Sequence, residues 1–263
     1  MRELEPPDQS TVNGIWDEVW KVDDPVSTRL LFTHRMFIEG FPVYKRYIPR
    51  DAKDILEVGT GTGRYGVAIA REFPESRVVV TDILESALAL ARRAASDAGV
   101  TNAVFRKEDA LKLSFPDDSF DIIFSDAVLQ HLPEPERALR EMYRVLRPGG
   151  RVIASSVNGW NIPHRLHRGL LFAVGKEYRY GYEKNFTPRE LKQLFLREGF
   201  DVIGEDGYYF AYGVYRWKVY HPMWKYVGGA LNRVTKLLDA VSFRAVSRYL
   251  GFEIICVGRK PAE

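Results

Sequence analysis

The sequence has a single cysteine, Cys256, among its 263 residues. One cysteine excludes an intramolecular disulfide and leaves no thiolate cluster for a metal ion, so a reducing, intracellular compartment is expected. No apolar run reaches the roughly 18 residues that a membrane-spanning helix needs. The first ten residues, MRELEPPDQS, are polar and lack the apolar core of a secretory signal. These absences predict a cytoplasmic globular protein.

Charge is unevenly distributed along the chain. The net charge is +3, yet residues 1–150 carry 20 Lys and Arg against 25 Asp and Glu, whereas residues 151–263 carry 18 against 10. The first part is therefore acidic and the second basic. A basic half suits an anionic substrate or a membrane surface, although solubility alone also favours charged surfaces.

The central part of the chain alternates between two kinds of hydrophobic pattern. Short apolar runs predict strands at 52–58, 76–82, 102–109 and 151–156, and residues 115–126 predict a turn followed by a further strand. Amphipathic segments predict helices between them at 63–73, 84–99 and 133–150, the last stopped by Pro148 and Gly149. Strands that alternate with helices in this way form a parallel sheet covered on both faces. Residues 10–48 are also predicted to be helical.

Ligands of such a sheet bind beyond the C-terminal ends of the strands, near the point where strand order reverses. The first strand leads into ILEVGTGTGRYG, residues 55–66. Its glycines fit two patterns. Gly59, Gly61 and Gly63 fit E-x-G-x-G-x-G, whereas Gly61, Gly63 and Gly66 fit the G-x-G-x-x-G of a dinucleotide turn. The glycines alone therefore permit either S-adenosylmethionine or NAD.

Four carboxylates help to distinguish the two cofactors. Glu57 directly precedes the glycines, where it would repel a pyrophosphate but tolerate a cationic sulfonium and ammonium. Asp82 ends the second strand and can accept the ribose hydroxyls of either cofactor. Asp109 can accept a hydrogen bond from the adenine amine, and Asp126 from an amino-acid moiety. The set favours S-adenosylmethionine and leaves Gly66 a role in packing the helix on the strand.

With these residues in place, the chain resembles the class I S-adenosylmethionine-dependent methyltransferases, in particular the branch that methylates small molecules, lipids and quinones. The resemblance rests on DILEVGTGTGRYG, VVVTDI and EDALKLSFPDDSFDIIFSDAVLQHLPEPERALREMYRVLRPGGRVIAS, which cover residues 54–156 almost without gaps. It continues in FTPRELKQLFLREGF and LGFEIICVGRKP. It implies an α/β, Rossmann-like, seven-stranded mixed sheet of order 3-2-1-4-5-7-6, flanked by helices, with strand 7 antiparallel.

The resemblance also implies a role for each residue of the site. Glu57 would support the glycine loop and the amino end of the ligand, while Gly59, Gly61 and Gly63 would line the methionine moiety. The remaining cofactor contacts would be Asp82 on the ribose, Ile83 against the adenine, Asp109 on the adenine amine, Ala110 beside the ring and Asp126 on the methionine part. The product of the cofactor would be S-adenosyl-L-homocysteine.

Methyl transfer from a sulfonium is an in-line displacement, for which the protein supplies alignment and exclusion of water. It needs no metal, and no spacing of Cys or His indicates one. A base is needed only where the acceptor must lose a proton. Candidates by chemistry alone are His131, His164, His167 and Tyr182. His164 and His167 lie three apart on a predicted helix, where a basic solvated face is the expected setting.

Two segments, 157–185 and 208–250, lie outside the shared core. We expect them to form helical caps over the acceptor pocket of a methyltransferase domain at 51–263, together with an N-terminal helical lid at 1–50. Segment 208–250 holds 11 Phe, Trp or Tyr and seven Lys or Arg against one acid, Asp239. Such a segment suits a packed lid, an anionic lipid surface or nucleobase stacking. Nucleic acid is the weakest of these because no RNA-binding module is present.

The sequence therefore predicts a methyltransferase acting on a small or lipid-like acceptor, cytoplasmic or peripheral to a membrane through 208–250. Three alternatives stay open: an RNA or protein methyltransferase, an NAD(P)-dependent oxidoreductase, and a protein that binds S-adenosylmethionine without catalysis. The sequence does not indicate the oligomeric state.

Overall fold

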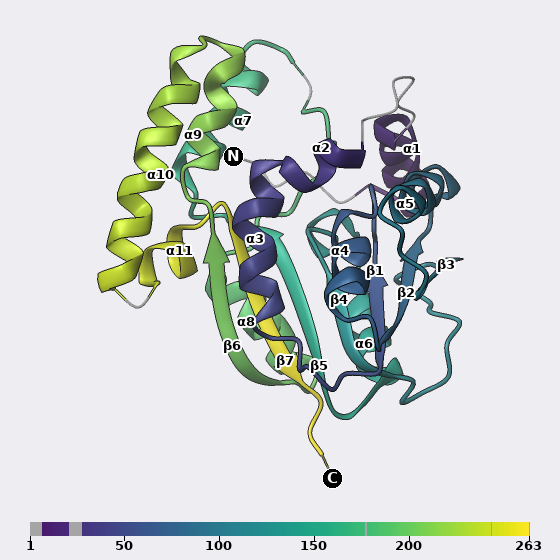
Figure 1. Cartoon of the computed structure of the whole chain (residues 1–263). Coiled ribbons are helices and arrows are strands. Elements are labelled where there is room, and N and C mark those ends of the chain that lie inside the picture. Colours follow the sequence, from purple (N-terminus) through teal and green to yellow (C-terminus); the bar gives the residue numbers. More distant parts are fainter. Residues whose placement is uncertain (1–6, 21–27, 177, 243, 263) are drawn as a thin grey trace.

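The computed structural model describes residues 7–20, 28–176, 178–242 and 244–262. One seven-stranded sheet runs through the molecule with helices packed against it (Figure 1). Its strands are β1 (Asp54–Val58), β2 (Arg77–Asp82), β3 (Ala103–Lys107), β4 (Phe120–Ser125), β5 (Leu146–Val157), β6 (Asp201–Tyr208) and β7 (Glu253–Arg259). The helices of the sheet layers are α3 (Arg35–Lys45), α4 (Arg64–Glu72), α5 (Glu85–Asp97), α6 (Pro135–Val145) and α8 (Pro188–Arg197).

The strand order is β3-β2-β1-β4-β5-β7-β6, as predicted. The pairs from β3 to β5 are parallel, and β7 is antiparallel to both β5 and β6. Leu56 of β1 lies between Val79 of β2 and Ile123 of β4, and all three side chains are buried. Continuous apolar runs thus form the central strands because helices cover both of their faces.

The two faces of the sheet have separate cores. Helices α3, α4 and α5 contribute to the core on one face, which includes Tyr44 and Phe124. Helices α6 and α8 contribute to the core on the other face, which includes Leu139 and Phe195. The C-terminal ends of the parallel strands lie between these two layers, and loops follow them there.

The prediction of a helix at 133–150 is wrong at its C-terminal end. Helix α6 stops at Val145, and β5 begins at Leu146 and runs to Val157, earlier than the predicted strand at 151–156. Leu146 is fully buried and pairs with Phe120 of β4. Pro148 disfavours helical conformation in the residue before it, so the chain has already become extended when the Arg-Pro-Gly-Gly sequence begins.

The helices outside the sheet layers gather near the C-terminal ends of β1, β2 and β6 (Figure 1). They are α1 (Gln9–Trp20), α2 (Thr28–Thr33), α7 (Ile162–Ala173), α9 (Tyr212–Tyr215), α10 (Met223–Val241), α11 (Ala245–Leu250) and the 3-10 turns η1 (Leu129–His131) and η2 (Arg216–Val219). The predicted helical N-terminus is thus observed, apart from residues outside the described ranges. Within those ranges, no helix is long and apolar enough to cross a bilayer.

Candidate active site

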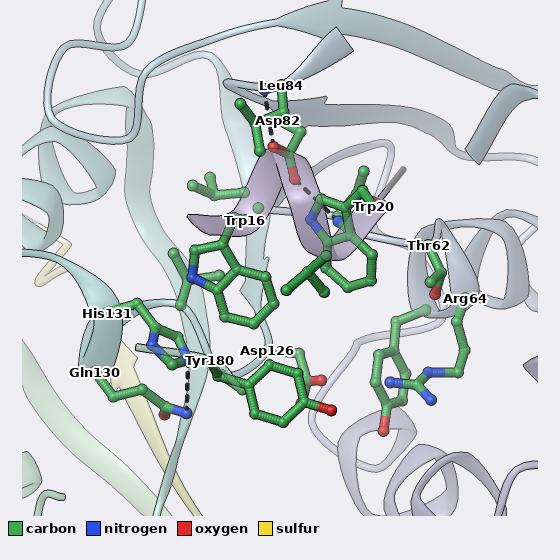
Figure 2. Close-up of a pocket in the computed structure, with 18 of the residues that line it drawn as sticks. Trp16, Trp20, Thr62, Arg64, Asp82, Leu84, Asp126, Gln130, His131 and Tyr180 are labelled. Atoms are coloured by element: carbon green, nitrogen blue, oxygen red, sulfur yellow. Dashed lines mark hydrogen bonds between the residues drawn. The ribbon is translucent and has the colours of Figure 1, made fainter. Parts of the chain in front are cut away.

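A cavity of about 500 Å³ lies at the C-terminal edge of the sheet. It begins between the ends of β1 and β4. From β1 the strands continue to β2 and β3 on one side, and from β4 they continue to β5 on the other, so the strand order reverses at this point. This is the position expected for a ligand in an open α/β sheet. Figure 2 shows side chains converging on it from α1, from the glycine loop after β1, and from the ends of β2 and β4.

The glycine loop is held in a conformation that side chains rarely adopt. Gly59, Gly61 and Gly63 have φ of 75°, 54° and 78°. A Cβ on Gly63 would lie 2.5 Å from the Cα of Ala91 on α5, so this glycine permits α4 and α5 to pack closely. The amides of Gly59 and Thr60 donate to the carbonyl oxygen of Thr81. The loop is therefore tied to β2 before any ligand binds.

The carboxylate of Glu57 fixes the glycine loop through two hydrogen bonds. Its Oε1 accepts a hydrogen bond from the amide of Gly66 at 3.0 Å, and its Oε2 accepts one from the hydroxyl of Thr60. Burial raises the pKa of Glu57 to about 7. A dinucleotide turn needs its first-turn amides for the pyrophosphate. Here Glu57 already accepts from one of them, which argues against a dinucleotide.

Gly66 packs against this carboxylate. A Cβ added to it would lie 2.2 Å from Glu57 Oε2, so no larger residue fits between the helix and the strand. The structure thus gives Gly66 the packing role that the sequence predicts.

The carboxylate of Asp82 fixes two turns at once. Its Oδ2 accepts a hydrogen bond from the amide of Gly61 and its Oδ1 from that of Leu84, each at 3.0 Å (Figure 2). Burial raises the pKa of Asp82. Each carboxylate oxygen has a further lone pair, so the side chain can still accept from ligand hydroxyls. Ile83, the next residue, also lines the cavity.

Asp109 and Ala110 line the same end of the cavity. Asp109 does not end β3, because that strand stops at Lys107 and the residue lies in the following turn. Its Oδ1 accepts a hydrogen bond from the amide of Leu111 at 2.9 Å. The predicted strand at 102–109 is therefore one residue too long at its start and two at its end, but Asp109 still lines the cavity.

Asp126 follows β4 and belongs to a polar cluster that the sequence analysis missed. Its Oδ1 accepts hydrogen bonds from the hydroxyl of Tyr44 on α3 and, at 3.0 Å, from that of Ser155 on β5. Glu253 lies beside it, and its Oε2 accepts from the hydroxyls of Tyr208 at 2.6 Å and Tyr44 at 3.2 Å. Both carboxyl groups line the cavity.

Burial and the neighbouring Asp126 carboxylate raise the pKa of Glu253 well above its usual range. Both causes favour the neutral form of the Glu253 carboxyl group. Glu253 is the first residue of β7. Because β7 is antiparallel, its start lies at the edge where the parallel strands end. The sequence LGFEIICV shows this glutamate at the start of an apolar run. That it belongs to the site follows only once the direction of β7 is known.

Arg64 is a second residue that the sequence analysis missed. It opens α4 and lines the cavity, and its Nε is buried without a hydrogen-bond partner. Its guanidinium lies 5.2 Å from the centre of the Tyr65 ring. An unsatisfied N–H group at this position can donate a hydrogen bond to an oxygen atom of a ligand.

Aromatic side chains fill the mouth of the cavity. Trp16 of α1 stacks on Trp20 and on Tyr180, with ring centroids 5.3 and 5.5 Å apart (Figure 2). The ring of Trp20 lies against Gly61, and a Cβ on that glycine would be 2.8 Å from it. The Trp16–Trp20 spacing predicted the helix, but not the contact of both rings with the cavity.

Comparison with known proteins places the chain in a family. Residues 49–206 match a methyltransferase domain family. The chain belongs to this family. It is 35% identical over 167 residues to a demethylmenaquinone methyltransferase of Listeria monocytogenes, in an alignment that covers 57% of this chain and 70% of that one. Identity to the Thermus thermophilus protein of the same name is 32% over 166 residues, covering 57% and 75%.

A solved structure supports the fold over a longer range. An S-adenosylmethionine-dependent methyltransferase from Thermotoga maritima, titled as a possible histamine N-methyltransferase, has a TM-score of 0.64 at 20% identity. The comparison covers 95% of this chain and 99% of the other. At that identity it shows the class I fold alone.

The protein is therefore an S-adenosylmethionine-dependent methyltransferase, and the nicotinamide alternative falls. The cavity fits this cofactor. Asp82 can accept from two hydroxyls, and Glu57 already accepts from the amide of Gly66, which a pyrophosphate would need. Among the described residues, no group of three His, Cys, Asp or Glu side chains could hold a metal ion.

Of the candidate bases, His131 alone lines the cavity of the methyltransferase. Its Nδ1 lies 2.8 Å from the carbonyl oxygen of Tyr182 and its Nε2 3.4 Å from Gln130 Nε2, and burial lowers its pKa. Tyr182 contributes that carbonyl oxygen near His131. In the described chain, its neighbours Tyr178 and Tyr180 line the cavity.

The expectation of a solvated face for His164 and His167 is wrong. Both rings are buried; His164 Nε2 lies 3.0 Å from Glu183 Oε1, and His167 packs edge-on against Tyr220. Neither residue lines the cavity within the described structure. Helix α7 turns its histidines inward, and apolar residues such as Leu166 and Leu170 are exposed instead.

Proposed function

We propose that this methyltransferase transfers the methyl group of S-adenosylmethionine to a small, lipid-like acceptor. The observation that carries the proposal is one cavity that extends from Asp82 and Asp109 to an aromatic end lined by Tyr178, Tyr212 and Phe252. A cavity walled by aromatic side chains suits a compact apolar molecule, whereas RNA or a folded protein needs an open groove. The relatives named for demethylmenaquinone support an acceptor of this class.

The cofactor would occupy the half of the cavity next to β1, β2 and β3. Asp82 would accept from the ribose, with Ile83 against the adenine, and Asp109 would accept from the adenine amine beside Ala110. The methionine part would lie along Gly59 and Gly61, close to Glu57 and Asp126, whereas Gly63 faces Ala91 of α5 and does not line the cavity in the described structure. The bound cofactor supplies an electrophilic methyl carbon on a sulfonium. The chain itself supplies alignment and exclusion of water.

The acceptor would occupy the half next to β4, β5 and β7. Glu253 lies beside Asp126, and because burial raises the pKa of Glu253, its carboxylate, once ionised, is a stronger base than an ordinary carboxylate. We assign the removal of an acceptor proton to this pair. His131 acts as a positioning residue, since its Nδ1 lies within hydrogen-bond distance of the Tyr182 carbonyl oxygen.

In this proposal the part of residues 1–50 that precedes α3 acts as a lid, because α3 packs in a layer of the sheet. Residues 51–263 form the methyltransferase domain, with 157–185 and 208–250 as caps. The lid would close through α1, whose Asp17 Oδ1 accepts a hydrogen bond from the hydroxyl of Ser86 on α5 at 2.8 Å. We place the protein in the cytoplasm, peripheral to a membrane that contains the acceptor.

A methyl-transfer screen tests the proposal. Labelled S-adenosylmethionine is incubated with the protein and with cell extract divided into lipid, small-molecule, RNA and protein fractions. We expect label in the lipid or small-molecule fraction and loss of most of it in Glu253→Gln, with S-adenosylhomocysteine affinity retained. Label confined to RNA or protein would overturn the acceptor class. Binding of the cofactor without transfer to any fraction would favour the non-catalytic alternative.

A further inference from the structure

Helix α10 exposes its apolar side to solvent. At ~100° per residue, Met223, Val227, Ala230, Val234, Leu237 and Val241 fall within about 40° of one line along the helix. All six are exposed, Leu237 to 71% and Val241 to 77%. The buried residues of α10 are Gly228, Thr235 and Asp239. A helix that only roofed a pocket would bury its apolar stripe, so this helix is oriented for a second apolar surface.

Helix α7 has the same inverted arrangement. Ile162, Leu166 and Leu170 recur every four residues and are exposed, while His164 and His167 are buried between them. Phe172, near the end of the helix, is 82% exposed. The two helices are connected through η2, where Trp217 Nε1 donates to the carbonyl oxygen of Pro163. Exposed apolar residues of this extent mark a contact surface.

The charges around the two stripes have one sign. Arg233 of α10 is exposed about 80° from its apolar line, whereas the exposed Lys225 lies farther round the helix, about 160° from that line. The described acids of segments 157–185 and 208–250 are Glu183 and Asp239, and both are buried. Asp239 Oδ1 accepts from the amide of Ser247, and Glu183 Oε1 lies 3.2 Å from Arg168 Nη1. The exposed charge of these segments, over their described residues, is therefore positive.

We propose that the outer faces of α7 and α10, which we call the cap surface, dock on an anionic lipid bilayer. Apolar side chains flanked by uncompensated cations are the composition of helices that lie in the membrane interface. A second copy of the chain would oppose like charges across a two-fold axis, and a nucleic acid would leave the apolar stripes unburied. The inference rests on the proposed function, because it lets a lipid-like acceptor reach the cavity, which the cap residues Tyr212 and Arg216 also line.

Vesicle co-sedimentation of the full chain tests the proposal. The vesicles are phosphatidylcholine alone or phosphatidylcholine mixed with phosphatidylglycerol, at low and high salt. We expect sedimentation with the mixed vesicles, weakened by salt and by Lys225→Glu with Arg233→Glu. Leu237→Glu should lower the partition about tenfold or more, because a charge replaces a buried leucine at the interface. The matched control is Leu196→Glu, at an exposed leucine of α8 on the sheet body, and it should change little.

Two further measurements separate the outcomes. Titration calorimetry with S-adenosylhomocysteine shows whether each variant keeps its fold and cofactor site, since no substituted residue lines the cavity. If the proteins bind the cofactor but the wild type does not bind vesicles, the proposal of a cap surface is overturned and the proposed function stands. The same holds if Leu237→Glu binds vesicles as well as the wild type does. Analytical ultracentrifugation that finds a dimer broken by Leu237→Glu would also overturn it. Vesicle binding without cofactor binding would contradict the proposed function alone.

Discussion

At the scale of single residues, Glu57 and Asp82 both shape the glycine loop but act on different partners. Glu57 accepts hydrogen bonds from Gly66 and Thr60 and is enclosed by the protein, whereas Asp82 accepts from Gly61 and Leu84 and faces the cavity. The cofactor site is thus largely formed before binding. Changes at the two residues should therefore have separable effects.

Asp82→Ala should weaken binding of S-adenosylmethionine by about 1–3 kcal/mol, because it removes a charged acceptor from the ribose site. It also releases the amide of Gly61, so part of the loss will come from a looser loop. Titration calorimetry measures the change, and Glu85→Ala, at an exposed residue opening α5, serves as the control. Unchanged affinity in the Asp82 variant would show that the ribose lies elsewhere.

Glu57→Gln should flatten the dependence of stability on pH. The pKa of Glu57 in the folded protein is raised to about 7 by burial, so the folded state binds more protons than the unfolded state between roughly pH 4.5 and 7. Its contribution is full below that window and is lost as pH rises through it, by about 3 kcal/mol. Urea unfolding across this range measures the slope, which an amide cannot produce. Equal slopes in both proteins would refute the buried ionisation.

At the scale of elements, local pattern predicted the alternation of strands and helices, the strand-end carboxylates and, through the family resemblance, the strand order. It failed where a distant partner decides the outcome. Helix α6 ends early because Leu146 pairs with β4, and Glu253 reaches the site because β7 is antiparallel. The sequence predicted helical caps at 157–185 and 208–250, but it cannot tell which side of α7 or α10 faces the protein. The inward histidines of α7 could not be predicted for that reason.

Helix α1 should become protected from hydrogen exchange when S-adenosylhomocysteine binds. The described helix lies over the cavity outside the sheet layers, and its contacts with the body include the Ser86–Asp17 hydrogen bond, the rings of Trp16 and Trp20, and Ile15 against Gly181. Such an element opens locally at low free energy, and a ligand beneath it adds contacts. Exchange followed by mass spectrometry should slow in 9–20 and stay unchanged in α8. No change in α1 would contradict its role as a lid.

At the scale of the whole molecule, ligand binding at the strand edge should stabilise both halves of the sheet together. S-adenosylhomocysteine at 100 times its dissociation constant adds about 2.7 kcal/mol to the free energy of unfolding. For a chain of this size that corresponds to a rise in melting temperature of roughly 5–10 °C. Differential scanning calorimetry measures the shift, and NAD at the same concentration should give none. A comparable rise with NAD would contradict the choice of cofactor.

The pairing of Tyr208 with Glu253 has a consequence for how such a protein can diversify. Residues 209–252 leave the sheet at the last residue of β6 and return at the first residue of β7, so the whole excursion begins and ends at two directly paired positions. A loop closed in this way can be lengthened, shortened or exchanged without altering the register of any strand. The segment that lines the proposed acceptor end of the cavity can therefore change while β1 to β4 keep their register.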